Sequence, residues 1–182
     1  IVTVSKAPYR LRVLDPMANQ SSSVDLPLRP TALGINPDGT YAAVGHDGHL
    51  SIINLESLDR EATWPVTFPV VDVVLASSGW AYATPPSDRH SCMRSVDMST
   101  GLELLRSDNA TDYSTYLVLH DGQDVLYGSG GGYFHGFEVD GGTITFNRDL
   151  GFFPNSVANV FGPMWKHATR AQIYTRNGDV LK

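Results

Sequence analysis

The stretch TALGINPDGTYAAVGHDGHLSIINLES, from Thr31 to Ser57, decides the fold. Asn36-Pro37-Asp38-Gly39 predicts a tight turn, because proline presets φ, aspartate can bond its own backbone and glycine tolerates a positive φ. His46-Asp47-Gly48-His49 predicts a second turn. The segments beside these turns are short and apolar, and we predict them as strands: Ala32–Ile35, Tyr41–Val44 and Leu50–Leu55.

The last of these strands is apolar on both faces. Side chains alternate along a strand, so Leu50 and Ile52 share one face while Ile53 and Leu55 share the other. A sheet that contains such a strand must be covered on both sides. A blade of a β-propeller, packed between two neighbouring blades, meets that condition.

The same order of strands and turns recurs twice farther along the chain. Asn54, Asp97 and Asp140 each end a third strand, and successive members of this series are 43 residues apart. Four-stranded propeller blades repeat about every 40–45 residues. The sequence therefore predicts an all-β fold, a β-propeller of four-stranded antiparallel blades, in a single domain over residues 1–182.

About three whole blades and two partial ones are predicted. In the first blade, Pro16–Ser23 is predicted as a polar turn and Val24–Leu28 as the outer strand. Such an arc leaves sheet faces and strand edges exposed. Three arrangements stay open: a segment of a larger propeller, which is preferred, a homodimer that closes one ring, or a small ring completed by both termini. The approximate blade bounds are 1–28 (partial), 30–66, 69–107, 113–149 and 157–182 (partial).

Composition excludes several classes of protein. The net charge of −6 disfavours a broad basic face for nucleic acid, so no nucleic-acid partner is predicted. No apolar run reaches the ~18–20 residues of a membrane-spanning helix, so no membrane span is predicted. Cys92 is the only cysteine, which excludes a disulfide within the chain, and it is expected to pack as a small hydrophobe.

Two segments resemble a YVTN-type β-propeller repeat. They are INPDGTYAAVGHDGHLSIINLES and WAYATPPSDRHSCMRSVDMSTGLELL, the second of which carries the Asp-x-x-Thr-Gly ending at Asp97–Gly101. LHDGQDVLYGSGGGYFHGFEVDGG is similar more loosely, because Gly128–Gly132 replaces the usual polar loop. The resemblance covers about Pro30 to Gly142 and implies a propeller of the surface-layer and quinoprotein-like superfamily. It also implies an extracytoplasmic location, periplasmic or secreted.

The loops between second and third strands of propeller blades gather on one face of the molecule, where we expect a binding face. The first such loop holds His46, Asp47 and His49, and the second holds three more polar residues. The third is the predicted loop Gly128–Gly132, followed by an aromatic residue and a histidine. The candidate binding-face residues are His46, Asp47, His49, Asp88, Arg89, His90, Tyr133 and His135.

Imidazole and carboxylate groups together suit a zinc or other transition-metal site, or acid–base chemistry. His46, His49 and His90 are therefore weak metal candidates. Asp-Gly between the first two is ordinary turn chemistry, so solvated loop residues are the favoured interpretation and no metal or cofactor is predicted. Ser129 stands in no Gly-x-Ser-x-Gly elbow, and the sequence identifies no catalytic residue.

The leading functional interpretation is a non-enzymatic binding or scaffold module for a protein or other extracytoplasmic ligand. The alternative, implied by the resemblance, is a metal-dependent lactonase-like hydrolase or a quinoprotein-like enzyme that uses the loop face. A purely structural surface-layer repeat is a third possibility. Three tryptophans are expected to pack between blades: Trp64, Trp80 and Trp165.

Overall fold

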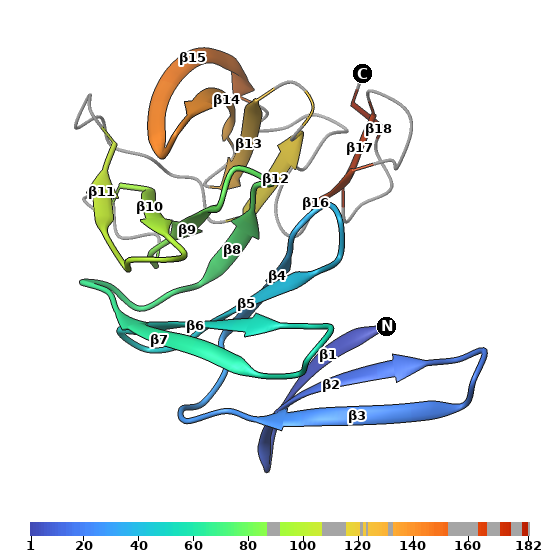
Figure 1. Ribbon diagram of the computed structural model, residues 1–182. Helices are drawn as coiled ribbons and strands as arrows, with labels where there is room; N and C mark the ends of the chain where they lie inside the picture. Colours follow the sequence, from blue (N-terminus) through green and yellow to red (C-terminus); the bar gives the residue numbers. More distant parts are fainter. Residues whose placement is uncertain are drawn as a thin grey trace.

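In the computed structural model, the described part of the chain is built mainly from β-strands (Figure 1). The structure describes residues 1–86, 92–106, 116–120, 122, 124–130, 133–152, 164–166, 172–175 and 180–181.

The described strands form five antiparallel sheets, in each of which every strand pairs with the next one along the chain. The first sheet contains β1 (Val2–Lys6), β2 (Tyr9–Asp15) and β3 (Gln20–Asp25). The second contains β4 (Ala32–Ile35), β5 (Tyr41–Gly45), β6 (His49–Asn54) and β7 (Arg60–Pro65). The third contains β8 (Asp72–Leu75), β9 (Trp80–Thr84), β10 (Arg94–Asp97) and β11 (Glu103–Leu105). The fourth contains β12 (Tyr116–His120), β13 (Val125–Gly130), β14 (Tyr133–Asp140) and β15 (Thr143–Phe152). The fifth contains β16 (Met164–Lys166), β17 (Ile173–Thr175) and β18 (Val180–Leu181).

The five sheets are arranged as a fan around the strands β4, β8, β12 and β16 (Figure 1). Each of these inner strands contacts the next one: β4 touches β8, β8 touches β12, and β12 touches β16. The approach of β4 to β8 depends on Gly34, because a Cβ atom there would lie 2.5 Å from the carbonyl oxygen of Val73. This radial order of antiparallel sheets agrees with the predicted propeller.

Apolar side chains fill the space between successive sheets. Leu50 and Ile52 of β6 belong to the cluster between the second and third sheets, whereas Ile53 belongs to the cluster between the first and second. The prediction that β6 is covered on both faces is therefore confirmed. Two further clusters join the third sheet to the fourth and the fourth to the fifth.

The recurring Asp or Asn at the end of a third strand closes the turn that follows it. Oδ1 of Asp97 accepts hydrogen bonds from the main-chain N–H groups of Ser99 and Thr100 at 2.8 and 3.2 Å. Asn54 and Asp15 make the same pair of bonds to the second and third residues after them. These are Asx turns, which explains why this position recurs with a short polar side chain.

Two local predictions were wrong. Residues 20–23 belong to β3 and not to a polar turn, because their main chain pairs with β2 along its whole length. Gly128–Gly130 continue β13 instead of starting a loop, because they pair with Tyr133–His135 of β14. In both cases cross-strand hydrogen bonding outweighs the preference of serine and glycine for turns. The strand predicted at 157–161 and the turn at 177–178 lie outside the described residues.

The tryptophans differ in their surroundings. Trp64 and Trp80 each contact a glycine of the next sheet, as expected for residues packed between blades. Trp165 is 53% exposed on β16 instead. Cys92 is buried, as predicted for a small hydrophobe.

Candidate functional site

The two faces of the first sheet differ in character. One face packs on the second sheet through Leu11, which is fully buried, and through Val2, Val4, Val13 and Val24. The other face, here called the outward face, carries mainly polar and charged side chains and is not packed against any sheet that the structure describes. A sheet face of this kind is a candidate contact surface.

Strand register arranges the outward face in three rows across the strands. Because opposed residues of paired strands share a face, each row contains one side chain from each strand. The rows are Ser5–Arg10–Asp25, Thr3–Arg12–Ser23 and Ile1–Leu14–Ser21.

The first row is satisfied internally. Nε of Arg10 donates to Oδ1 of Asp25 at 2.6 Å, and the two groups form an ion pair. The hydroxyl of Ser5 donates to the carbonyl oxygen of Pro8 at 2.6 Å. This row therefore offers little unused charge.

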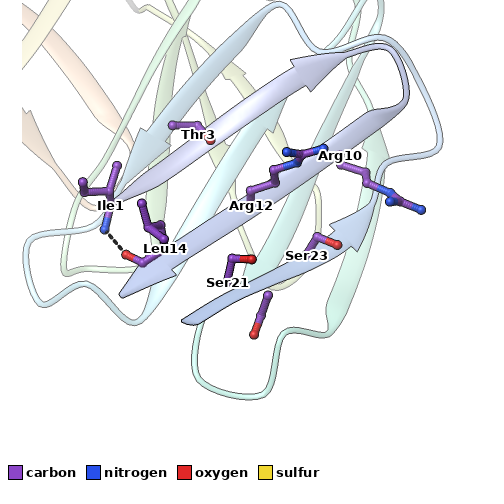
Figure 2. Close-up of a pocket in the computed structure, with 8 residues that line it drawn as sticks. Ile1, Thr3, Arg10, Arg12, Leu14, Ser21 and Ser23 are labelled. Carbon is purple, nitrogen blue, oxygen red and sulfur yellow. Dashed lines mark hydrogen bonds between the residues drawn. The ribbon is translucent and has the colours of Figure 1, made fainter. Parts of the chain in front are cut away.

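The second row is different, because Arg12 makes no hydrogen bond or ion pair with any part of the chain that the structure describes. It lies between the hydroxyl groups of Thr3 and Ser23 on the neighbouring strands. Figure 2 shows these side chains on the same side of the sheet. An open pocket of about 350 Å³ lies here, lined by Ile1, Thr3, Arg10, Arg12, Leu14, Ser21, Ser22 and Ser23.

The third row adds an apolar strip beside the guanidinium. Ile1 and Leu14 are joined by two main-chain hydrogen bonds, each of 2.8 Å (one is drawn in Figure 2). As whole residues, Ile1 is 68% exposed and Leu14 is 39% exposed. The pocket thus combines the Arg12 guanidinium, which has no described partner, with several hydroxyl groups and an apolar margin. That combination suits a ligand with an anionic oxygen group and an apolar part.

His46 lies between β5 and β6, and its side chain is buried with no exposed area. Its Nδ1 lies 3.1 Å from the carbonyl oxygen of Arg29, which can only accept, so Nδ1 carries the proton. Nε2 then accepts from the hydroxyl of Ser51 at 2.9 Å, and Ser51 lies 3.0 Å from the hydroxyl of Thr63. Both ring nitrogens are engaged, and burial lowers the pKa of His46 below its usual value, so the ring is neutral and structural.

The other predicted site residues lie in several places. Asp47 is exposed and His49 half-buried, and Nδ1 of His49 lies 3.4 Å from the carbonyl oxygen of Asp47. His135, in the fourth sheet, packs its ring against Phe137 and Phe146 with centroids 6.1 and 5.7 Å apart. Tyr133 begins β14, while Asp88, Arg89 and His90 lie outside the described residues. Within the ranges that the structure describes, no group of three or more His, Cys, Asp or Glu side chains could hold a metal ion.

Asp72 is a carboxylate that the sequence interpretation did not select. It starts the inner strand β8, and its Oδ2 accepts a hydrogen bond of 2.8 Å from the main-chain N–H of Leu117 in the next inner strand. Oδ1 accepts from the N–H of Val73 at 3.0 Å. Burial raises the pKa of Asp72 to about 6 despite these two donors, which favour the charged form. Asp72 therefore links two inner strands, and burial places its pKa above the usual range of an aspartate.

Sequence signals for both missed features exist. Arg10-Leu11-Arg12-Val13 alternates polar and apolar residues, as expected for a half-exposed strand. Its partner strand β3 was not predicted, because the run of serines at Ser21–Ser23 is typical of a turn. Asp72 is a carboxylate beside the apolar run Val73–Leu75, a combination that is costly unless the carboxylate has partners.

No helix among the described residues is long and apolar enough to cross a membrane. No protein-family model matches the sequence. No curated protein matches it either.

Several solved structures are similar to this chain. BamB from Moraxella catarrhalis is 12% identical with a TM-score of 0.66, and the match covers 96% of this chain and 51% of that one. The Cps50 (Swd1) β-propeller domain of Myceliophteria thermophila is 14% identical with a TM-score of 0.60, over 79% of this chain and 52% of that one. Hydrazine synthase of Kuenenia stuttgartiensis is 12% identical with a TM-score of 0.60, over 78% and 43%.

The present chain thus spans about half the length of these solved structures. Identities this low establish a shared fold and carry no information on ligand or activity. Together with the fan of antiparallel sheets around β4, β8, β12 and β16, they show that the chain folds as blades of a β-propeller.

Proposed function

We propose that this chain is a non-enzymatic binding module, built from YVTN-type propeller repeats and located outside the cytoplasm. Its contact surface is the outward face of the first sheet. The observation that carries this proposal is the position of Arg12, an exposed guanidinium without a described partner, in an open pocket of about 350 Å³. The exposed Asp47 and the half-buried His49, which begins β6, form a second candidate contact.

A protein is the proposed kind of partner. The outward face presents side chains at the regular spacing of a strand, about 6.8 Å between alternate residues. An extended polypeptide has the same spacing, so its side chains can match those of β2 one by one. The neighbouring apolar and hydroxyl groups suit the mixed composition of a protein surface. A second copy of this chain, or another propeller segment, is a special case of such a partner.

The experiment that tests this function uses the whole chain and a panel of three labelled extended peptides, one acidic, one basic and one neutral. Binding is measured by fluorescence anisotropy, and the contact is located by hydrogen–deuterium exchange. We expect at least one peptide to bind and to slow exchange in β2 and β3. Slower exchange only around Asp47 and His49 would move the contact surface there. Absence of binding by all three peptides would overturn the proposal.

A second candidate function is supported by Asp72. A carboxyl group with a pKa near 6 on an inner strand suits proton transfer at neutral pH, which a metal-dependent lactonase-like hydrolase or a quinoprotein-like enzyme requires. Hydrolysis of a panel of lactones, with and without added divalent cations, tests this alternative. Lactone hydrolysis that is lost in Asp72→Asn but kept in Asp47→Asn would establish an enzyme. Equal rates of hydrolysis with and without the protein would exclude the lactonase activity.

A further inference from the structure

We propose that the Arg12 pocket binds the carboxylate of an aspartate or glutamate in an extended partner segment that lies along β2. This inference rests on the proposed binding function and names the partner's chemistry. The segment places its acidic side chain over Arg12 and an apolar side chain, two residues away, over Leu14.

Charge favours a single carboxylate as the occupant. The outward face carries three charged side chains: Arg10, Arg12 and Asp25. Arg10 and Asp25 neutralise each other at 2.6 Å, which leaves Arg12 as the charged side chain of this face without a described ion-pair partner. A carboxylate carries one negative charge and matches it. A phosphate group carries up to two, and a nucleic acid carries many, so both would leave charge uncompensated on a chain whose net charge is already −6.

The geometry of the donors also fits a carboxylate. A guanidinium presents parallel N–H groups that bind the two oxygens of a carboxylate at once. The hydroxyls of Thr3 and Ser23 flank the guanidinium in the same row and can donate to the remaining lone pairs. Neither hydroxyl has a described hydrogen-bond partner that would have to be displaced.

The apolar strip fixes the position of the segment. Leu14 follows Arg12 by two residues on the same face of β2, at the strand spacing of about 6.8 Å. Ile1 lies beside Leu14 in the same row, the third one, and widens the apolar strip. A segment with an acidic residue and an apolar residue two positions apart covers both features at once, which a lone anion does not.

The test uses the peptide Ser-Thr-Val-Ser-Glu-Ser-Thr with a neutral fluorophore, and a matched peptide with Gln in place of Glu. Fluorescence anisotropy gives the affinity of the whole chain for each peptide. We expect the Glu peptide to bind about three- to tenfold more tightly than the Gln peptide, the range for an exposed ion pair with two parallel hydrogen bonds. Arg12→Gln should remove this difference in affinity. Leu14→Ser should lower the affinity for both peptides equally.

Lys6→Gln is the matched control, because it removes one exposed positive charge from the same sheet without touching the pocket. We expect it to keep the preference for Glu. A preference for Glu that persists in Arg12→Gln, or a peptide displaced by inorganic phosphate more readily than by acetate at equal ionic strength, would overturn the carboxylate site while leaving the binding function intact. A dimer in light scattering that hides β2 from exchange would assign the face to a second copy instead.

Discussion

The indole ring of Trp64 lies directly against the α-carbon of Gly101 in the neighbouring sheet. A Cβ atom at position 101 would lie 2.5 Å from Cδ2 of the ring, and Nε1 donates to the carbonyl oxygen of Met98 at 2.9 Å. Trp80 and Gly142 repeat this contact between the third and fourth sheets. Gly101, which ends the segment Asp97–Gly101, therefore packs directly against Trp64 of the preceding blade.

Gly101→Ala should destabilise the protein by about 3 kcal/mol, because it combines a strained backbone with a steric clash. The φ of Gly101 is 74°, a conformation that costs any residue with a Cβ atom. The added methyl group also displaces the indole ring from its hydrogen bond to Met98. Urea denaturation, followed by tryptophan fluorescence, measures the loss in free energy of unfolding.

Gly39→Ala separates the two causes. Its φ is 77°, nearly the same as that of Gly101, but a Cβ atom there would meet nothing within 4 Å. It should cost only about 1 kcal/mol, the backbone contribution alone. Equal losses in the two variants would show that the contact with Trp64 contributes nothing to the stability of the blade junction.

The sequence predicted the propeller fold, because the signals for its strands and turns are local. A turn such as Asn36–Gly39 or an Asx turn at Asp97 depends on residues that are neighbours in the chain. The character of the outward face depends instead on which strand pairs with β2. The run Ser21–Ser23 has the composition of a turn, and only its pairing with Arg12 and Leu14 makes it a strand.

The burial of the His46 side chain could not be predicted from the sequence either. Its neighbours Asp47 and Gly48 have the composition of a solvated turn, and Asp47 is indeed exposed. The imidazole turns inward because Arg29, 17 residues earlier in the chain, and Ser51 offer it one acceptor and one donor. Partners so separated in sequence leave no periodic pattern to read.

Ser51→Ala should destabilise the second sheet by about 1–3 kcal/mol, the cost of leaving a buried polar group without its partner. The substitution removes the donor to Nε2 of His46 and the neighbour of the Thr63 hydroxyl. Thermal unfolding monitored by circular dichroism measures the effect. Ser22→Ala, at an exposed position of β3, is the control and should change stability by less than about 0.5 kcal/mol. A Ser51→Ala variant as stable as Ser22→Ala would contradict the structural role of His46.

Glu103→Gln should loosen the connection between the second and third sheets. The Glu103 carboxylate accepts from the N–H of Thr67 at 2.8 Å, from the Thr67 hydroxyl at 2.5 Å and from Nε of Arg94 at 3.2 Å. An amide keeps the shape but loses the charge and one acceptor, at a cost of about 1–2 kcal/mol. Hydrogen–deuterium exchange should speed up at Thr67 with little change in β1–β3. Glu56→Gln, on an exposed turn, should leave this exchange unchanged.

Asp72→Asn should change the pH dependence of stability. Burial raises the pKa of Asp72 to about 6 in the folded state from an ordinary value of 3.8, so between these values the folded chain binds the proton and the unfolded chain does not. The Asp72 contribution to stability is therefore largest below pH 4 and falls as the pH rises to about 6, where it levels off.

The difference in free energy of unfolding between the wild-type protein and Asp72→Asn isolates this contribution, since the opposite dependence expected from His46 is common to both. We expect the variant to gain roughly 2–3 kcal/mol relative to the wild type between pH 4 and pH 7, with little further change above pH 7. Urea denaturation at half-unit intervals of pH measures the difference. A difference that is constant over this range would mean that the carboxyl group ionises in the folded protein as it does in water, and Asp72 would then be no candidate for proton transfer at neutral pH.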